Sequence, residues 1–314
     1  MIQKNIVLFI LILFIKAVSL NASSIEEVIS IDIKKKLIIG YSGAPVSYDY
    51  WYKLKKSLFL KGKELDVIVV DFSSDILTYE AQKKNLLHAI DLKVDGMIIG
   101  AVSDKVATII DEFELHKIPV VAFNFSIKHN WISTVIATNN DKAAAIAGNY
   151  MLKHLEKIKN DRSRVIILSG DKSLEDALIR ASIPKKLLSD QGYIVHEYYA
   201  REWSAKYSIK DLISEYSDNP EDIIAVFSCF ANASIASVEV SKKFGFKPLQ
   251  IGFDMDENMN KMIRNNQLDA TIMQDPKRIG ELGIESIVKI LRKEVLEKKI
   301  EVPALLVTKA NLVQ

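Results

Sequence analysis

Two polar side chains each follow a short apolar run late in the sequence. Asp254 follows Ile251-Gly252-Phe253, and Gln274 follows Ala270-Thr271-Ile272-Met273. Apolar runs that do not alternate are typical of strands covered on both faces in parallel sheets, and ligands bind at the carboxyl ends of such strands. A carboxylate accepts hydrogen bonds, and an amide both donates and accepts them. The two residues therefore predict a binding site for a polar molecule. The alternatives are that Asp254 caps the helix expected to begin at Asp256 to Met259, and that Gln274 only holds the chain in place.

Aromatic side chains gather after the first expected strand, Leu37 to Gly40. The segment from Tyr41 to Trp51 holds four of them, including Tyr50 and Trp51. Exposed aromatic rings are costly in a loop unless they cover something, so this loop is a candidate wall of a binding site. The alternative is that Tyr50 or Trp51 packs under the helix that follows.

Further candidate residues follow other expected strands. Asn124 comes directly after the apolar run Ile118 to Phe123, and its amide suits hydroxyl groups or a carbonyl. Trp203 follows a strand expected around Ile194 to Tyr199, and its alternative role is to fill a gap between surface loops.

The sequence holds no recognisable catalytic or metal-binding motif. It has no glycine-rich dinucleotide or phosphate motif, no G-x-S-x-G, and five histidines without H-E-x-x-H or Cys/His metal spacing. The single cysteine, Cys229, lies in an apolar run and is expected to be a buried, unreactive thiol. We therefore expect neither an enzyme nor a cofactor nor a metal site.

Length and charge restrict the remaining classes. A chain of 314 residues with 49% hydrophobic content is long enough for two cores. The 42 basic and 40 acidic residues are interspersed and give a net charge of +2, so no single-signed surface is available for nucleic acid.

The N-terminus has the layout of a secretory signal peptide. Lys4 precedes an unbroken apolar block from Ile6 to Ile15, and small residues such as Ser19 and Ala22 follow. The block is too short for a membrane-spanning helix. We predict a signal peptide over residues 1–22, with cleavage after Ser19 or Ala22, and a mature protein in the periplasm.

Short apolar runs alternate with stretches of helical spacing. The stripes Ala143, Ala147, Met151, Leu155 and Ile76, Tyr79, Leu86, Ile90 both fit one helix face. The apolar runs are Leu37–Gly40, Val67–Val70, Gly96–Gly100, Pro119–Phe123, Val165–Leu168, Ile224–Phe227 and Gln250–Phe253. Strand and helix in alternation predict a doubly wound α/β architecture.

The stretches around Asp254 and Gln274, together with the strand pattern from Lys36 to Asn311, resemble the type I periplasmic binding proteins of the ribose- and galactose-binding family. The resemblance implies two doubly wound parallel-sheet lobes joined by a hinge that the chain crosses three times. It places one lobe at residues 36–137 plus 276–302 and the other at 138–275 plus 303–314. Ligand between the lobes would favour their closure.

The resemblance also implies site residues. Tyr50 and Trp51 would stack on the ligand, Trp203 would close on it from the opposite lobe, and Arg180 would donate hydrogen bonds to it. For Arg180 the alternative is an ion pair with Glu175 or Asp176 on the same helix. The full set of expected ligand-binding residues is Tyr50, Trp51, Asn124, Arg180, Trp203, Phe230, Asp254 and Gln274.

The chain departs from the sugar-binding pattern at two places. Ser228 to Ala231 stands where relatives carry an Asn-Asp pair, and Phe125 stands where they carry an arginine. Unpaired polar groups cost binding energy, so a less hydroxylated ligand is expected. The retained Asp49-Tyr50-Trp51 resembles sensor-associated members, the autoinducer-binding receptor and the trimethylamine N-oxide sensor protein.

The expected function is thus a periplasmic, monomeric solute-binding protein that presents a small ligand to a membrane sensor histidine kinase or an ABC permease. The alternatives are a cytoplasmic regulator of the lac repressor type without its DNA-binding segment, and a hydrolase on the same fold. The export signal argues against the regulator, and the absence of a supported nucleophile and base argues against the hydrolase.

Overall fold

A computed structural model describes residues 36–45 and 49–312 of the chain. The predicted signal peptide, residues 1–22, and residues Ser47 and Tyr48 of the aromatic loop lie outside the described residues. From Leu37 onward the chain forms one compact unit. Among the described helices, none combines the length and the apolar character that crossing a bilayer requires.

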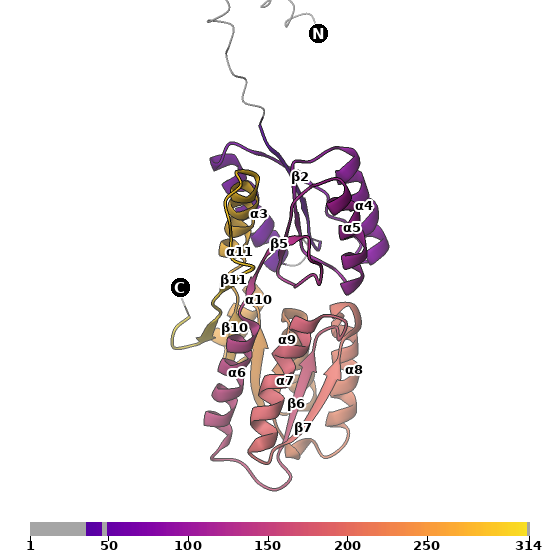
Figure 1. Cartoon of the computed structure of the whole chain (residues 1–314). Coiled ribbons are helices and arrows are strands. Elements are labelled where there is room, and N and C mark those ends of the chain that lie inside the picture. Colours follow the sequence, from indigo (N-terminus) through magenta and orange to yellow (C-terminus); the bar gives the residue numbers. More distant parts are fainter. Residues whose placement is uncertain (1–35, 46–48, 313–314) are drawn as a thin grey trace, which may run out of the picture. The chain divides into compact units, whose positions relative to one another are not determined.

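The first lobe, which contains the strands labelled β2 and β5 in Figure 1, is built on a six-stranded sheet in the order β11-β5-β4-β3-β1-β2. All its neighbouring strands are parallel. Its strands are β1 (Ile38–Ser42), β2 (Ile68–Asp71), β3 (Gly96–Ile99), β4 (Val120–Phe123), β5 (Ile132–Thr138) and β11 (Lys299–Val302).

Helices cover both faces of this sheet because successive strand residues point to opposite sides. Ile39, Val121 and Phe123 pack with the helices α3 and α11 in one core cluster. Met97 and Ala122 pack with α4 and α5 in the other. The helices are α3 (Asp49–Glu64), α4 (Tyr79–Asp91), α5 (Ala107–Leu115), the short η1 (Asp104–Val106) and α11 (Pro276–Leu291).

The second lobe repeats this plan in the order β12-β10-β9-β8-β6-β7. Only its last strand, β12, runs antiparallel to its neighbour. The strands are β6 (Arg164–Ser169), β7 (Ile194–Tyr199), β8 (Ile223–Ser228), β9 (Leu249–Phe253), β10 (Ala270–Met273) and β12 (Leu305–Thr308). The order of five parallel strands, 2-1-3-4-5, is therefore the same in both sheets and is that of the doubly wound fold.

The helices of the second lobe again lie on both faces of their sheet. Val165 and Ile167 of β6 pack with α6 and α7, and Ile166 and Leu168 pack with α8 and α9. The helices are α6 (Asn140–Leu155), α7 (Glu175–Asp190), α8 (Ala205–Tyr216), α9 (Ala231–Phe244), α10 (Glu257–Arg264) and the short η2 (Arg201–Trp203) and η3 (Pro220–Asp222).

The chain passes between the two sheets three times. It leaves the first after β5 and enters α6, returns from β10 through α11, and crosses again between β11 and β12. The predicted fold class, two doubly wound parallel-sheet lobes joined by three crossovers, is confirmed.

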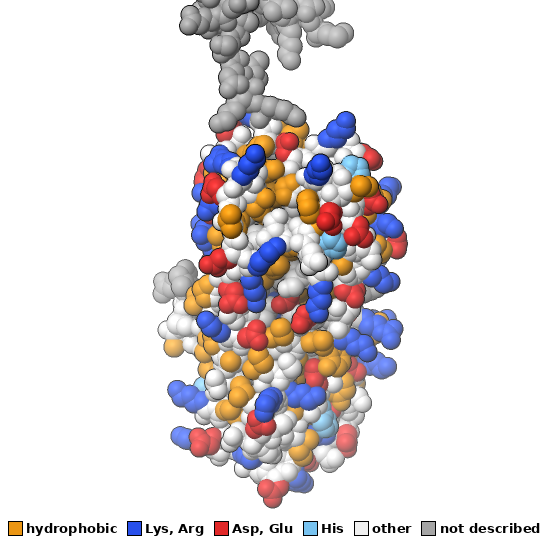
Figure 2. Space-filling model, in the orientation of Figure 1, with side chains coloured by type: hydrophobic (Ala, Val, Ile, Leu, Met, Phe, Trp, Pro, Cys, Tyr) orange, Lys and Arg blue, Asp and Glu red, His pale blue; other side chains and the backbone are white. Residues whose placement is uncertain are grey.

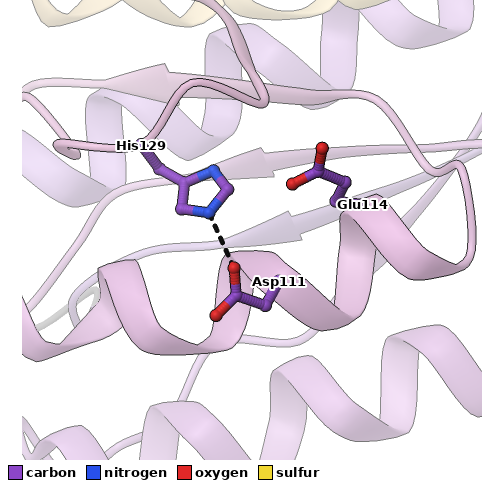
Figure 3. Close-up of side chains that lie close together, drawn as sticks. All are labelled: Asp111, Glu114 and His129. Atoms are coloured by element: carbon purple, nitrogen blue, oxygen red, sulfur yellow. Dashed lines mark hydrogen bonds and ion pairs between the residues drawn. The ribbon is translucent and has the colours of Figure 1, made fainter.

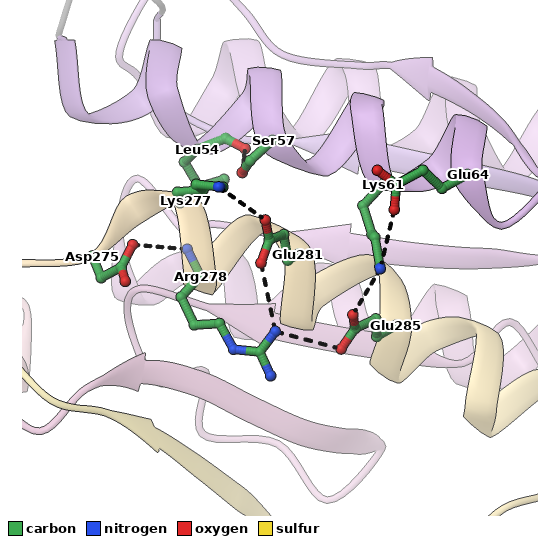
Figure 4. A network of polar contacts seen from close by, with 9 residues as sticks. All are labelled: Leu54, Ser57, Lys61, Glu64, Asp275, Lys277, Arg278, Glu281 and Glu285. Atoms are coloured by element: carbon green, nitrogen blue, oxygen red, sulfur yellow. Dashed lines mark hydrogen bonds and ion pairs between the residues drawn. The ribbon is translucent and has the colours of Figure 1, made fainter.

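The returning helix α11 lies directly on α3 (Figure 4). A Cβ atom at Gly280 would lie 2.4 Å from the carbonyl oxygen of Leu54, so only glycine allows this approach. Lys61 of α3 also pairs with Glu285 of α11 at 3.4 Å, and Asp275 caps α11 by accepting from the backbone N–H of Arg278. These contacts fix the start of α11, which directly follows Gln274.

Most of the predicted elements are present, with boundaries shifted by a residue or two. All four residues of the stripe from Ala143 to Leu155 are buried on α6. The other stripe was wrong at Ile76, which precedes α4 and is 63% exposed, because Thr78 caps that helix and starts it later. Figure 2 shows basic and acidic side chains interspersed over the visible face, as the charge balance predicted.

Candidate functional site

Tyr50 and Asn124 meet at the edge of the first lobe. Tyr50 lies in the first turn of α3 and donates its hydroxyl hydrogen to Oδ1 of Asn124 at 2.7 Å. Asn124 directly follows β4 and is 4% exposed. Burial raises the pKa of the Tyr50 hydroxyl, and the nearby Asp254 carboxylate raises it further, so Tyr50 stays a neutral donor. The hydrogen bond uses the amide oxygen of Asn124 and leaves its NH₂ group for another partner.

Trp51 forms the floor beside this pair rather than a free wall. It is 9% exposed and packs edge-on against Phe123 with 5.6 Å between ring centroids. A Cβ atom at Gly100 would lie 2.7 Å from its ring, so Gly100 makes the room that the ring fills. Most of the Trp51 side chain is therefore packed inside the lobe, as the alternative proposed, and only a small part of it can face the cavity.

Trp203 joins aromatic rings from both lobes. Its ring lies 5.6 Å from that of Phe125 in the first lobe and 5.6 Å from that of Phe230 in the second. It covers Gly170, where a Cβ atom would lie 2.3 Å from the indole. Trp203 is therefore more than a filler between surface loops, because it contacts the opposite lobe.

Arg180 is buried, and its guanidinium bonds to neutral acceptors. Its Nε donates to Oδ1 of Asn140 at 2.8 Å, Nη1 to the carbonyl of Cys229 and Nη2 to Oε1 of Gln274, both at 3.3 Å. The guanidinium carbon also lies 4.0 Å from the centroid of the Phe253 ring. The ion pair with Glu175 or Asp176 was the wrong alternative. Glu175 pairs with Lys128 instead, and Asp176 accepts from Ser126 and Asn140.

Gln274 links Arg180 to Asp254. Its Nε2 donates to Oδ1 of Asp254 at 2.6 Å, and its Oε1 accepts from Arg180 and, at 2.6 Å, from Thr138. Gln274 thus does hold the crossover, as one alternative proposed, and it also presents its amide to Asp254. The amide relays the attraction between the buried guanidinium of Arg180 and the half-buried carboxylate of Asp254.

Asp254 lies at the start of α9 without capping its own following helix. Asp256 caps α10 by accepting from Met259 N–H, so the capping alternative for Asp254 was wrong. The Asp254 carboxylate lies near the backbone N–H of Ala231, the first residue of α9, and this N–H lowers the pKa of the carboxyl. Burial raises its pKa above the ordinary value, against the opposing effects of Arg180 and Gln274. A ligand hydroxyl that donates to this carboxylate would stabilise its charged form.

These side chains line one cavity of about 420 Å³, a volume in the range of small-molecule sites. All eight predicted site residues line it, and their contact with a ligand stays a prediction. Residues that the sequence did not single out for the site complete the lining: Ala44, Asp49, Leu77, Ala101, Val102, Phe125, Ala231, Asn232, Met255 and Asp256. Ala101, Val102 and Asn232 follow β3 and β8 closely, so the strand-end rule could have found them.

A second hollow of about 760 Å³ adjoins this cavity and shares Tyr50, Asp254, Met255 and Gln274 with it. Three of its four lysines form ion pairs, Lys53 with Asp49, Lys61 with Glu64 and Lys277 with Glu281. The smaller cavity is the better candidate, because polar groups with unused hydrogen-bonding capacity converge in it.

The comparisons with known proteins agree with this geometry. A family model described as a periplasmic binding protein domain matches residues 39–294. The chain belongs to the periplasmic binding protein family. The relatives described next are named as binding proteins.

Two kinds of relative illustrate the similarity of this periplasmic binding protein to known ones. The ribose import binding protein of Bacillus subtilis is 25% identical over 278 residues, which is 88% of each chain. The glucose-galactose binding protein GanP of Geobacillus stearothermophilus superimposes with a TM-score of 0.82, at 18% identity, over 89% of this chain and 99% of its own. A solute-binding protein of Agrobacterium radiobacter in complex with D-arabinose gives 0.80, at 19% identity, over 88% and 96%.

A group of metal-ligand side chains lies away from the cavity of this binding protein. Asp111 and Glu114 of α5 lie near His129 (Figure 3), and His129 Nε2 is 2.9 Å from Oδ1 of Asp111. The backbone N–H of Trp131 donates to Nδ1 of His129, which places the ring proton on Nε2. Nε2 of His129 therefore donates to Asp111 and has no lone pair to offer a metal. The contact between His129 and Asp111 is an ordinary hydrogen bond.

Trp131 and Cys229 have structural roles in this family member. Trp131 donates its indole N–H to the carbonyl of Ile118 at 2.7 Å. Cys229 is fully buried, and burial raises the pKa of its thiol, so a reactive thiolate is disfavoured as predicted.

Proposed function

We propose that this chain is a periplasmic receptor that binds an uncharged sugar or polyol in the cavity lined by Tyr50, Trp203 and Asp254. The observation that carries the proposal is the network in which Gln274 joins Arg180 to Asp254. The charge of the buried Arg180 is balanced by that of the half-buried Asp254, while Asp49 pairs with Lys53 and Asp256 caps α10, so the cavity needs no charge on the ligand. The names of the relatives, which import ribose or bind glucose and galactose, support the same class of ligand.

The hydrogen-bonding capacity of the network suits hydroxyl groups. Arg180 has five N–H groups, three of which bond to Asn140, Cys229 and Gln274. A ligand acceptor can then bind to the two remaining N–H groups of Arg180 or to the NH₂ of Asn124. A ligand donor can bind to the Asp254 carboxylate. A hydroxyl both donates and accepts, so a few hydroxyls along one edge of a ring would satisfy all of them.

We further propose that the two lobes, residues 36–137 plus 276–302 and 138–275 plus 303–314, close on the ligand as units. Tyr50 and Asn124 belong to one lobe, and Trp203, Arg180 and Asp254 to the other. A ligand that touches both sets favours the arrangement in which they face each other. The proposal includes export by the signal peptide at residues 1–22 and action as a monomer.

The membrane partner is proposed to be an ABC permease, as in the import proteins among the relatives. A sensor histidine kinase is the second candidate, supported by Asp49-Tyr50-Trp51 at the cavity, the segment that resembles sensor-associated members. Co-purification of the ligand-loaded protein with each membrane protein encoded beside it would distinguish the two.

Thermal unfolding with a panel of neutral sugars and polyols, sugar acids and amines tests the ligand class. A ligand that binds only the folded state raises the melting temperature. We expect stabilisation by at least one neutral member, abolished in Trp203→Ala and Asp254→Ala and retained in Trp131→Phe, which lies outside the cavity. A response to acids alone, or an unchanged response in both cavity variants, would refute the proposal.

A further inference from the structure

Phe230 occupies a position where its own helix would favour a polar residue. It is the N-cap of α9, and its side chain makes no capping hydrogen bond. Ser, Thr, Asp and Asn are preferred at N-caps because their side chains accept from free N–H groups of the first turn. The carboxylate of Asp254 lies near the backbone N–H of Ala231 and brings a negative charge to this first turn from another segment. A large apolar residue at a cap position breaks a local rule, and such exceptions concentrate at functional sites.

Phe230 is part of an aromatic wall of the cavity. It is 5% exposed and contacts Trp203 edge-on, with the rings at 90°, and Trp203 in turn lies against Phe125, which is 7% exposed. We call these three residues the aromatic wall. The two phenylalanines offer no ordinary hydrogen-bond donor or acceptor. The buried hydrogen-bonded network of the cavity, by contrast, consists of Asn124, Asp254, Gln274 and Arg180, and Asp49, Asn232 and Asp256 are further polar residues of its lining.

This division affects hydroxyl groups of a ligand unequally. A hydroxyl directed at the network exchanges hydrogen bonds with water for hydrogen bonds with protein. A hydroxyl pressed against the aromatic wall loses its water and gains no partner. A hydrogen or methyl group at the same ring position is instead buried favourably against the rings.

We propose that Phe230 is a specificity-determining residue that makes the cavity select a deoxy sugar over the corresponding fully hydroxylated sugar. The inference rests on the proposed function and specifies its ligand class. Discrimination of roughly ten-fold or more in affinity is expected for one buried hydroxyl without a partner.

Matched pairs of sugars test the inference on the mature chain by calorimetric titration. The pairs are D-fucose with D-galactose, L-rhamnose with L-mannose, and 6-deoxy-D-glucose with D-glucose, which differ in one hydroxyl. In the wild type we expect the deoxy member of at least one pair to bind about ten-fold more tightly. Phe230→Asn should reduce that ratio to about one or invert it, because the amide gives the hydroxyl a partner.

The variant and its controls separate specificity from folding. Asn is a favoured N-cap residue, so Phe230→Asn keeps α9 capped. Phe230→Met keeps an apolar wall and should keep the preference. Phe246→Asn makes the same chemical change at a ring that packs on Tyr216 outside the cavity lining, and should leave the ratio unchanged.

Each outcome bears on the inference. Parent sugars that bind as tightly as their deoxy partners in the wild type would overturn it and leave the proposed function standing. A deoxy preference that survives Phe230→Asn would show that Phe230 is not its source. Binding of no member of any pair would count against both the proposed function and the inference.

Discussion

Asn124 and Asp254 occupy equivalent positions in the two lobes. Each follows a phenylalanine at the end of the fourth strand of its sheet, β4 or β9, and each has a left-handed backbone with φ of 66° or 73°. Each also donates its backbone N–H at 2.8 Å to the next strand, Asn124 to Ile136 and Asp254 to Ile272. The repeated turn aims one polar side chain from each lobe into the same cavity.

The turn itself restricts what can replace Asn124. Asparagine tolerates the left-handed region, whereas most residues with a Cβ atom lose roughly 1–2 kcal/mol there. Asn124→Gly should therefore be about 1 kcal/mol more stable than Asn124→Ala in urea unfolding, and both should lose the same ligand affinity. As a control, Ala101→Gly, at a cavity residue without a positive φ, should be less stable than the wild type. Equal stability of the Asn124 variants would contradict this account of the turn.

The half-buried carboxylate of Asp254 predicts a pH dependence of stability. Because burial raises its pKa in the folded state, ionisation of Asp254 opposes folding. The contribution of Asp254 to the free energy of unfolding is fully present below its ordinary pKa of 3.8. This contribution is lost as the pH rises through the raised pKa of the folded state. The wild type should therefore gain free energy of unfolding relative to Asp254→Asn as the pH falls from 7 toward 4.

Urea unfolding of both proteins at several pH values without ligand measures this difference. Asp256→Asn is the matched control, because it makes the same chemical change at the neighbouring carboxylate, which caps α10 by accepting from Met259 N–H. A difference between wild type and Asp254→Asn that stays constant with pH, or grows in the opposite direction, would show that Asp254 does not oppose folding.

Asp176 ties the two lobes together beside the aromatic wall. Its Oδ2 accepts from the backbone N–H of Ser126 in the first lobe at 3.2 Å, and its Oδ1 accepts from Asn140 at 3.1 Å. A hydrogen bond of this kind contributes about 0.5–1.5 kcal/mol. Asp176→Ala should thus weaken ligand binding by roughly three- to ten-fold, and small-angle scattering should show a larger radius of gyration.

The neighbouring residue gives a matched control for Asp176. Glu175 also reaches the first lobe, through Lys128 at 2.9 Å, but both side chains are more than half exposed. Exposed ion pairs contribute little, so Glu175→Ala should change affinity by less than about three-fold. Equal effects of the two substitutions would mean that the hydrogen bond from Ser126 to Asp176 does not couple the lobes.

The local pattern of the sequence was enough to predict most strands and the polar residues at their ends. The runs ending at Phe123 and Phe253 show no alternation because both faces of each sheet are covered, and Asn124 and Asp254 follow from those ends. The relation between Arg180 and Gln274 could not be predicted in this way. These residues are 94 positions apart, and nothing local indicates that Arg180 bonds to an amide rather than to the acids on its own helix.

The roles of the aromatic residues were also only partly predictable. Their number marked the loop up to Trp51, but whether a ring fills a core or faces a cavity depends on the space opposite it. Gly100 makes that space for Trp51, and Gly170 makes it for Trp203. Strands β5, β11 and β12 were not among the predicted runs. The burial of β5 and β11 alternates or stays partial, and the apolar run at β12, Ala304 to Val307, is short and only partly buried.

Gly170 gives a direct test of the position of Trp203. The residue has no Cβ atom, and one placed there would lie 2.3 Å from the indole ring, closer than any normal contact. Gly170→Ala must therefore displace Trp203 from Phe125 and Phe230. We expect ligand affinity to fall at least ten-fold and tryptophan emission to shift to longer wavelength as the ring gains water.

Gly283→Ala is the control, since a Cβ atom there would meet its nearest neighbour at 3.6 Å and the residue lies within α11. Its ligand affinity and tryptophan emission should stay as in the wild type. Unchanged binding in Gly170→Ala would mean that Trp203 is not part of the ligand site.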